Sequence, residues 1–182
     1  MQVITGKYRG RKLLSLDTEK TRPTLARVKE SLFSMVDEYI FDSTVLDLFA
    51  GSGALGIEAI SRGAKKVYFV DNNKDAKVVI EKNLKNVKED FSVEISDFAS
   101  ALDKYASLGV KFDMIFMDPP YKSDFAGRAL ELLDKKNLLH DGSIVCLEYE
   151  GSNRLQSFPK CYIIKKHKTH GIAGIVILEY KK

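Results

Sequence analysis

Short apolar runs with the composition of buried strands alternate along this chain with segments whose apolar residues recur at helical spacing. The strand-like runs are residues 44–49, 66–70, 92–95, 112–117 and 142–147; the helix-like segments between them are residues 54–62, 73–86, a stretch after residue 95, and 125–136. Strands separated by helices of this length predict a mostly parallel sheet that is covered on both faces.

The two ends of the chain depart from this alternation. Residues 161–165 and 172–180 are β-rich, and the short connection Thr169-His170-Gly171 predicts that they pair antiparallel. At the other end we expect a hairpin around Gly6–Gly10. After Pro23-Thr24 the chain has an apolar rhythm with the spacing of one helix face, at Leu25, Val28, Leu32, Met35 and Val36. The predicted fold class is α/β: a doubly wound, mostly parallel sheet with an antiparallel C-terminal edge hairpin and a short N-terminal β-hairpin/helix extension.

Length and composition are those of an ordinary globular protein. With 182 residues, 45% of them hydrophobic and 30% charged, we expect a single domain over residues 1–182. No apolar stretch approaches the ~20 residues that span a bilayer, and no basic leader precedes an apolar segment at the N-terminus. We therefore expect a cytoplasmic monomer with no membrane partner. The two cysteines, Cys146 and Cys161, form no metal or redox motif.

The positive charge of the chain is concentrated at its N-terminus. Residues 1–30 contain eight Lys and Arg against three Asp and Glu, a net charge of +5, whereas residues 31–182 contain 21 basic and 22 acidic residues, a net charge of −1. A localised basic segment is typical of proteins that bind a polyanion. A solvated basic hairpin without a partner is the alternative.

Residues 47–56, Asp-Leu-Phe-Ala-Gly-Ser-Gly-Ala-Leu-Gly, join the first strand of the predicted sheet to its helix. Gly51, Gly53 and Gly56 have the spacing G-x-G-x-x-G of nucleotide-binding turns. Asp71 ends the next strand, where a carboxylate can bind both hydroxyls of an adenosine ribose. NAD and S-adenosylmethionine both remain open at this point, because both carry an adenosine.

Three details favour S-adenosylmethionine over NAD. The carboxylate of Asp47 would repel a pyrophosphate, but it suits a ligand that bears an ammonium and a sulfonium. Asp97, after the third strand, can accept a hydrogen bond from the adenine amino group, with Phe98 beside the ring. Residues 118–121 have no evident role in hydride transfer, and the three histidines lie in predicted loops or edge strands, so no proton-transfer residue for a dehydrogenase is evident.

The tetrapeptide Asp118-Pro119-Pro120-Tyr121 directly follows the apolar run at residues 112–117. The carboxylate of Asp118 and the carbonyl of Pro119 can both accept hydrogen bonds from an exocyclic amine. The prolines remove two backbone donors and restrict φ, and Tyr121 offers a ring on which a base can stack. The tetrapeptide therefore favours a site that holds a flat heterocycle by its amino group. The alternative is a strand-to-loop exit with Tyr121 packed on the core.

Together these residues resemble a known family. Residues 47–64 and the tetrapeptide at 118–121 are similar to the bacterial RsmD-type methyltransferases, and Gly6–Leu13, Arg22-Pro23-Thr24 and Arg27–Phe33 match the opening of the same family. The resemblance covers essentially the whole chain. It implies a Rossmann-like class I S-adenosylmethionine-dependent methyltransferase with a seven-stranded sheet, which methylates the exocyclic N2 of one guanine in small-subunit (16S) ribosomal RNA.

The predicted site residues fall into three groups. The catalytic residues are Asp118, Pro119, Pro120 and Tyr121. The cofactor-binding residues are Asp47, Phe49, Ala50, Gly51, Gly53, Asp71, Asn72, Asp97 and Phe98. The RNA-binding residues are Arg9, Arg11, Lys12, Arg22, Thr24 and Arg27.

The resemblance also implies the ligands and the division of the chain. The cofactor is S-adenosyl-L-methionine, the product is S-adenosyl-L-homocysteine, and no metal takes part. The partner is ribosomal RNA, within the small ribosomal subunit or its assembly intermediate. Residues 1–40 form a basic RNA-binding extension, and residues 41–182 form the catalytic core.

Other functions compete with this interpretation. A DNA adenine-N6 methyltransferase would use the same acceptors on another amine, although 182 residues leave little room for the target-recognition domain that such enzymes carry. A non-catalytic RNA-binding protein with a methyltransferase fold, a methyltransferase acting on a protein amine, and a dehydrogenase are the remaining alternatives.

Overall fold

The computed structural model describes residues 1–16, 23–120, 124–150, 158–171 and 173–182. The helices are α1 (Pro23–Val36), η1 (Asp37–Tyr39), α2 (Ala54–Ser61), α3 (Lys74–Asn83), α4 (Phe98–Ser107) and α5 (Phe125–Lys135). The strands are β1 (Thr44–Leu48), β2 (Lys66–Asp71), β3 (Asp90–Ile95), β4 (Phe112–Met117), β5 (Leu139–Glu150), β6 (Tyr162–His170) and β7 (Ala173–Tyr180). None of the helices in these ranges combines the length and apolar character needed to cross a membrane.

The strands form one seven-stranded sheet in the order β3-β2-β1-β4-β5-β7-β6. Strands β1 to β5 are parallel where they pair, and β7 pairs antiparallel with both β5 and β6. The predicted doubly wound sheet with an antiparallel C-terminal edge is confirmed. The chain order reverses between β1 and β4, and in such sheets ligands bind beyond the carboxyl ends of the strands at this point.

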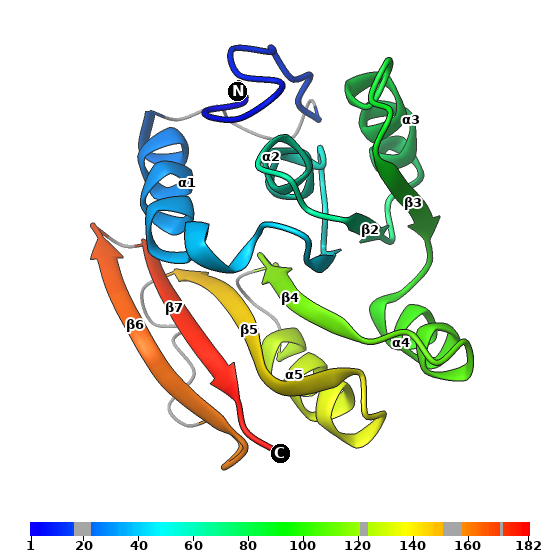
Figure 1. The fold of residues 1–182 in the computed structure, drawn as a ribbon, viewed down its shortest axis with the longest axis vertical. Coiled ribbons are helices and arrows are strands. Elements are labelled where there is room, and N and C mark those ends of the chain that lie inside the picture. The colour runs from blue at the N-terminus through cyan, green and yellow to red at the C-terminus, as the bar shows by residue number, and fades with distance from the viewer. Residues whose placement is uncertain (17–22, 121–123, 151–157, 172) are drawn as a thin grey trace.

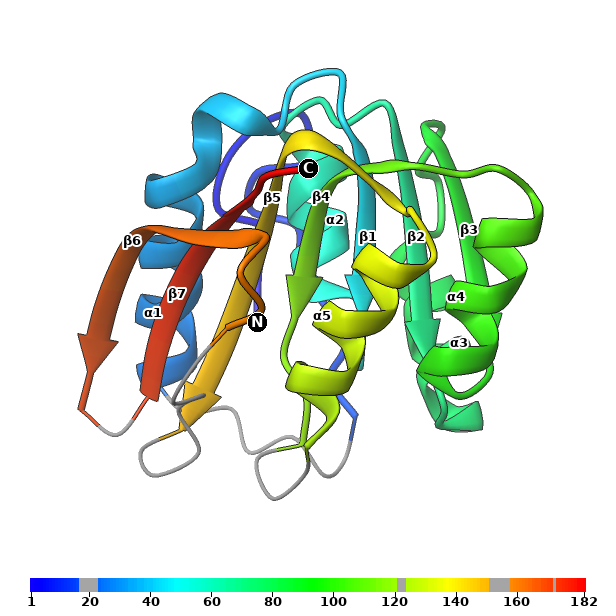
Figure 2. The ribbon, with the colours of Figure 1, turned by 90° about the horizontal axis from the view of Figure 1, so that it is seen from below.

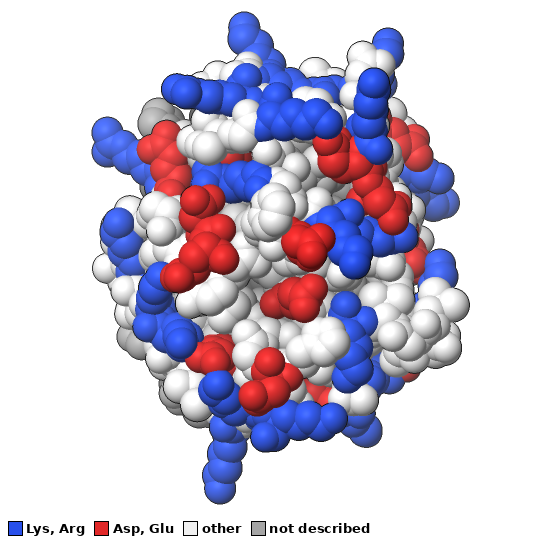
Figure 3. Space-filling model, viewed as in Figure 1, with Lys and Arg blue, Asp and Glu red and all other residues white. Residues whose placement is uncertain are grey.

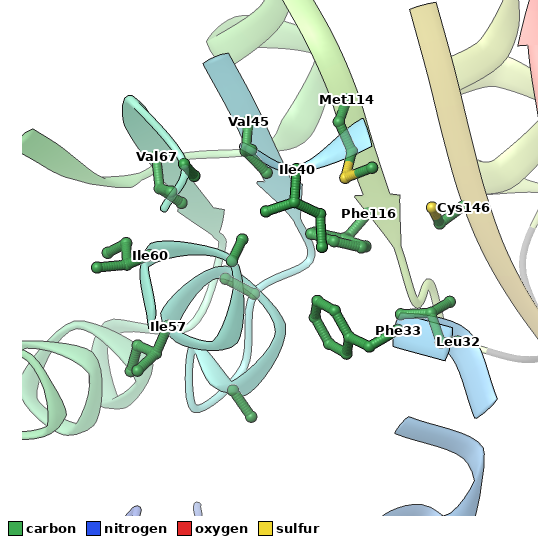
Figure 4. Close-up of a cluster of buried hydrophobic side chains, with 14 of the residues drawn as sticks. Leu32, Phe33, Ile40, Val45, Ile57, Ile60, Val67, Met114, Phe116 and Cys146 are labelled. Atoms are coloured by element: carbon green, nitrogen blue, oxygen red, sulfur yellow. The ribbon is translucent and has the colours of Figure 1, made fainter. Parts of the chain in front are cut away.

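Two helical layers cover the sheet, α1, α2 and α3 on one face and α4 and α5 on the other (Figures 1 and 2). Because side chains alternate along a strand, Val45 of β1 packs in the first layer and Leu46 in the second. The first core is centred on Phe33 of α1 and Phe116 of β4, whose ring centroids lie 5.4 Å apart (Figure 4).

The N-terminal segment is hydrogen-bonded to α2. The buried carboxylate of Glu58 accepts the backbone N–H groups of Ile4 (2.8 Å) and Thr5 (3.0 Å), and the hydroxyl of Ser61 donates to the Thr5 carbonyl at 2.6 Å. Gly6 has φ +85°, and a Cβ on it would lie 1.8 Å from the Ser61 carbonyl oxygen. Only glycine fits this close approach, so the turn of the segment is seated directly on the helix.

Glu58 is also the centre of a buried ion group. Its carboxylate lies 3.0 Å from the ammonium of Lys29 in α1 and 3.0 Å from Nε of Arg62, which reaches Asp37 at 2.6 Å. Burial lowers the pKa of Lys29, while the charge of Glu58 opposes this shift. The group therefore ties α1, α2 and the N-terminal segment together through one acceptor.

Several boundaries differ from the sequence-based expectations. The predicted N-terminal hairpin has no regular strands: its arms are joined by an isolated antiparallel bridge between Gln2 and Lys12 and by hydrogen bonds such as that from the Val3 N–H to the Arg11 carbonyl at 3.0 Å. The helix expected to reach residue 86 ends at Asn83, and Asn86 has φ +67°, a left-handed conformation that no helix continues through. Strand β6 extends to His170, so part of the predicted connection belongs to the strand.

We predict that Glu58→Gln lowers the free energy of unfolding by about 3–5 kcal/mol, because the shape is kept while Lys29 loses its counter-ion in a buried site. Urea denaturation measures the change. Glu81→Gln is the matched control, since Glu81 forms an exposed pair with Lys77 at 3.8 Å in the same i,i+4 spacing as Glu58 and Arg62. A loss at Glu58 no larger than the ~0.5 kcal/mol expected at Glu81 would contradict the prediction.

Candidate active site

The carboxyl ends of β1, β2 and β4 bring three aspartates to one edge of the sheet. The register places Asp47 opposite Phe69 of β2 and Phe116 of β4, and Asp71 and Asp118 each follow two residues later. Asp47 is buried, and burial raises its pKa to about 8, helped by the charges of Asp71 and Asp118 and opposed by a hydrogen bond from Gly56. Asp71 and Asp118 are thus close enough for their charges to affect the ionisation of Asp47.

The glycine-rich loop after β1 is held by two of these carboxylates. The N–H of Gly51 donates to Asp71 Oδ2 and the N–H of Gly56 donates to Asp47 Oδ2, each at 2.8 Å. Gly53, which precedes α2, has φ +78°. Ala50, also predicted to contact the cofactor, is buried in this loop and accepts the N–H of Gly53 at 2.7 Å.

Asp71 is partly exposed at the end of β2. Besides the Gly51 bond, its Oδ1 accepts the N–H of Asn73 at 2.8 Å. Each carboxylate oxygen can accept a second hydrogen bond, so Asp71 keeps acceptor capacity for the hydroxyls of a ligand. Asn72, beside it, is exposed to solvent.

Asp97 has a structural role in addition to its predicted contact with the cofactor. It is the N-cap of α4, where its Oδ1 accepts the N–H of Ser100 at 3.0 Å and its Oδ2 accepts the Ser100 hydroxyl at 2.5 Å. These hydrogen bonds lower the pKa of Asp97. The sequence interpretation missed this capping role, although Asp is among the residues preferred at a helix N-cap.

Three aromatic rings meet where β1, α4 and α5 come together. The Phe49 centroid lies 5.4 Å from Phe98 and 6.1 Å from Phe125, and Phe98 lies 5.3 Å from Phe125. Phe49 has φ +75°, an uncommon conformation for a residue with a side chain. Phe49 and Phe98 were predicted as cofactor-binding residues, whereas Phe125 was not, because it opens a helix that reads as an ordinary amphipathic one.

The loop after β4 is described as far as Pro120. Asp118 and Pro120 are exposed, whereas Pro119 is buried. Tyr121 lies outside the described residues. The exposed Asp118 carboxylate therefore follows the fully buried run Met114–Met117 of β4. Strand β4 pairs with β1, the strand that leads into the glycine-rich loop.

Glu148, near the end of β5, was not predicted. Burial raises its pKa well above the usual range, and the charges of Asp118 and Asp47 raise it further. The carboxyl therefore belongs to the same group as the aspartates. A signal was present in the sequence, since Glu148 directly follows the apolar run Ile144–Leu147 as Asp118 follows its own strand.

The predicted RNA-binding residues differ in their surroundings. Arg9, Lys12 and Arg27 are exposed, and Lys and Arg side chains gather over the N-terminal segment at the top of Figure 3. Arg11 is less free than expected, because its guanidinium donates to the Lys85 carbonyl and lies 5.6 Å from the centre of the Tyr8 ring. Arg22 lies outside the described residues, as does the side chain of Thr24 in α1.

A buried asparagine connects the N-terminal segment to the glycine-rich loop. Asn83 of α3 accepts the N–H of Leu14 at 2.8 Å, and its amide donates to the carbonyls of Leu14 (2.9 Å) and Ser52 (3.0 Å). The basic segment and the loop after β1 therefore share one side chain. Nothing in the sequence signals this contact, because an Asn at the end of a helix usually serves as a cap.

The arrangement suits a cationic ligand with an adenosine better than a dinucleotide. The N–H groups of Gly51 and Gly56 already donate to carboxylates, and the charge of these carboxylates would repel a pyrophosphate. Within the described ranges, no group of three or more His, Cys, Asp or Glu side chains is placed to hold a metal ion.

Comparison with known proteins agrees with this geometry. Residues 1–179 match the family model described as "Conserved hypothetical protein 95". The chain belongs to this family. The chain is 40% identical to the ribosomal RNA small subunit methyltransferase D of Haemophilus influenzae, over 96% of this chain and 91% of that protein. It is 32% identical to the Escherichia coli protein of the same name, over 94% of this chain and 85% of that protein.

The resemblance to the RsmD-type methyltransferases is thereby confirmed, and the fold agrees with it. The Escherichia coli protein yhhF superimposes with a TM-score of 0.87 at 29% identity, covering 100% of this chain and 98% of that chain. The similarity extends over the whole sheet and the N-terminal segment, so the glycine-rich loop and the loop after β4 lie within the shared architecture.

We predict that Gly56→Ala destabilises the protein by about 1–3 kcal/mol, because the new Cβ would lie 2.3 Å from Phe69 Cε1 and 3.0 Å from Asp47 Oδ2. Urea denaturation measures this loss. Gly109→Ala is the control, since Gly109 has φ +66° with nothing within 4 Å of a Cβ, so only the backbone penalty applies. A loss well below 1 kcal/mol in Gly56→Ala would show that the loop adjusts freely around position 56.

Proposed function

We propose that this protein transfers a methyl group from S-adenosylmethionine to the exocyclic N2 amine of a guanine in small-subunit (16S) ribosomal RNA. The observation that carries the proposal is the placement of Asp118 and Pro119 after β4, beside the strand that leads into the glycine-rich loop. An amine acceptor and a cofactor loop on neighbouring strands are what a methyl transfer between two bound molecules requires. The names of the 40% and 32% identical relatives support ribosomal RNA as the substrate.

The cofactor would be held by the residues predicted for it. Asp71 has acceptor capacity for the ribose hydroxyls, Asp97 and Phe98 lie where the adenine would be, and Asp47 faces the loop that would enclose the methionine part. A cation next to Asp47 favours its ionised form, so binding releases a proton at a pH below the raised pKa of about 8. When bound, the sulfonium supplies an already activated methyl group and leaves as a neutral thioether.

The protein's own contribution is to position and orient the amine. The Asp118 carboxylate and the Pro119 carbonyl accept the two N–H groups of the target, which localises the nitrogen lone pair and aims it at the methyl carbon. Such alignment supplies up to ~7–11 kcal/mol of barrier reduction. The methylated ammonium is acidic and passes its proton to Asp118 or to water. Asp118 is therefore an orienting acceptor before the transfer and a proton acceptor after it.

Residues 1–40 would form the RNA-binding extension of a catalytic core over residues 41–182. The exposed Arg9, Lys12 and Arg27 supply phosphate contacts, and Arg22 and Thr24 belong to the same predicted set. The target base must leave its stack to reach the end of β4, which costs a few kcal/mol. Phosphate contacts on the extension offset part of that cost, since they contribute affinity without reading sequence.

Methyl transfer from labelled S-adenosylmethionine tests the function directly. The acceptors are small ribosomal subunits from cells lacking this protein, their purified RNA, and DNA, followed by digestion to nucleosides. We expect N2-methylguanosine from the subunits or their RNA. N6-methyladenine in DNA would keep the cofactor and overturn the substrate, and binding of the cofactor without labelling of any acceptor would overturn the enzyme activity.

We predict that Asp118→Ala lowers turnover by about 100-fold or more, because the amine loses its orienting acceptor, while cofactor affinity changes little. Single-turnover kinetics and cofactor titration measure the two quantities. Asp90→Ala is the control, since Asp90 pairs with Lys66 at 3.0 Å at the beginning of β3, at the other end of the sheet. Retained turnover in the Asp118 variant would remove this residue from the mechanism.

A further inference from the structure

Glu148 stands beside Asp118 at the edge of the sheet. Its preceding residue, Leu147, is paired with Met117, the residue before Asp118. Cys146 and Phe116 pack in the core under α1 and α2, whereas Leu147 and Met117 pack in the core under α4 and α5. Because side chains alternate, the Glu148 carboxyl faces the α1–α2 side.

Asp47 faces the same side, since its neighbour Leu46 packs with Leu147 on the opposite one. The Glu148 side chain is only partly exposed, and its partner in β7 is the apolar Ile175. Within the residues that the structure describes, its carboxyl makes neither a hydrogen bond nor an ion pair. Removing most of a carboxyl from water without giving it a partner costs free energy, so packing alone gives no reason for an acid at this position.

We propose that Glu148 reads the lactam edge, N1–H and O6, of the guanine whose amine is held by Asp118 and Pro119. This inference rests on the proposed function and adds a specificity residue to it. The edge of guanine carries N2, N1 and O6 in a row. Because β4 pairs with β5, N2 can lie at the loop after β4 while N1 and O6 lie at Glu148. The segment after β4 thus presents acceptors for the amine, and β5 presents Glu148 for N1–H and O6.

The protonation state of Glu148 matches that edge. Burial, followed by the charges of Asp118 and Asp47, raises the pKa of Glu148 well above that of an ordinary glutamate, which favours the neutral carboxyl. The charged group of α1 that faces this side, Lys29, is engaged by Glu58 at 3.0 Å and does not compensate. A neutral carboxylic acid has one donor and one acceptor, so its O–H donates to O6 while its carbonyl accepts N1–H.

The same pairing disfavours adenine. Adenine presents an acceptor at N1 and its amine at the position of O6, so a neutral Glu148 would hold the adenine amine itself, away from Asp118. Adenine also has no amine at C2 for Asp118 to orient. One carboxyl would therefore select the base and set its register against the acceptor loop.

The pH dependence has a definite sign. The neutral acid is present below the raised pKa of Glu148 and is lost as the pH rises through it. An ionised Glu148 has no donor for O6 and adds a second negative charge beside Asp118. Glutamine has the same shape and the same donor and acceptor, and it does not titrate.

The test measures kcat/KM for methylation of small subunits, taken from cells lacking this protein, as a function of pH for the native protein, Glu148→Gln and Glu148→Ala. We expect Glu148→Gln to stay within about fivefold of the native protein at pH 7 and to lose its alkaline fall in activity. We expect Glu148→Ala to lose about 5- to 150-fold, the discrimination supplied by one bidentate base contact. Glu179→Gln, which removes a carboxyl on β7 paired with Lys165 at 2.8 Å, is the matched control.

Cofactor titration and thermal melting verify that each variant is folded. The inference is overturned if Glu148→Gln keeps the alkaline fall of the native protein, or if it is folded but inactive at pH 7. Full activity of Glu148→Ala would overturn it as well. In each case the native protein still forms N2-methylguanosine, so these failures are distinct from failure of the proposed function, in which no variant and no native protein forms it.

Discussion

The parallel register of β1 with β2 and β4 is the constraint on which the candidate site depends. It brings Asp47 level with Phe69 and Phe116, so the residues that follow them on the two neighbouring strands converge at one edge. Backbone hydrogen bonding, not side-chain attraction, holds these carboxylates together. Like charges would otherwise separate, and the sheet holds them in proximity because its core on both faces determines the register.

That enforced proximity accounts for the electrostatics of the site. Burial raises the pKa values of Asp47 and Glu148, and the surrounding carboxylates add to the effect. Hydrogen bonds from the glycine-rich loop act in the opposite direction at Asp47. A cationic ligand would relieve the repulsion, whereas an anionic one would increase it, so these interactions favour a cation at the candidate site.

Local patterns in the sequence predicted much of the fold and the centre of the site. The apolar runs predicted the sheet, and Gly51, Gly53 and Gly56 predicted the loop, because a tight turn leaves a spacing that can be read without the structure. Glu58, Asn83 and Glu148 were not predicted. Glu58 and Asn83 have their importance through partners distant in the chain, such as Leu14 for Asn83, 69 residues away, and no local pattern encodes such a pairing. Glu148 differs, because its place directly after an apolar run was a local signal that the sequence interpretation did not use. The role of Asp97 as a cap is local, but from the sequence this residue was assigned to the adenine amino group instead.

The docking of the N-terminal segment on Glu58 has a consequence for how the protein opens. Chain ends usually fray, because few hydrogen bonds hold them. Here the amides of Ile4 and Thr5 donate to the buried Glu58 carboxylate, which also binds Lys29 of α1, so releasing the segment removes two donors from a buried charge. We therefore expect the free energy of that local opening to exceed that of a segment held by few hydrogen bonds. The amides of Ile4 and Thr5 should then exchange slowly with solvent, as interior amides do.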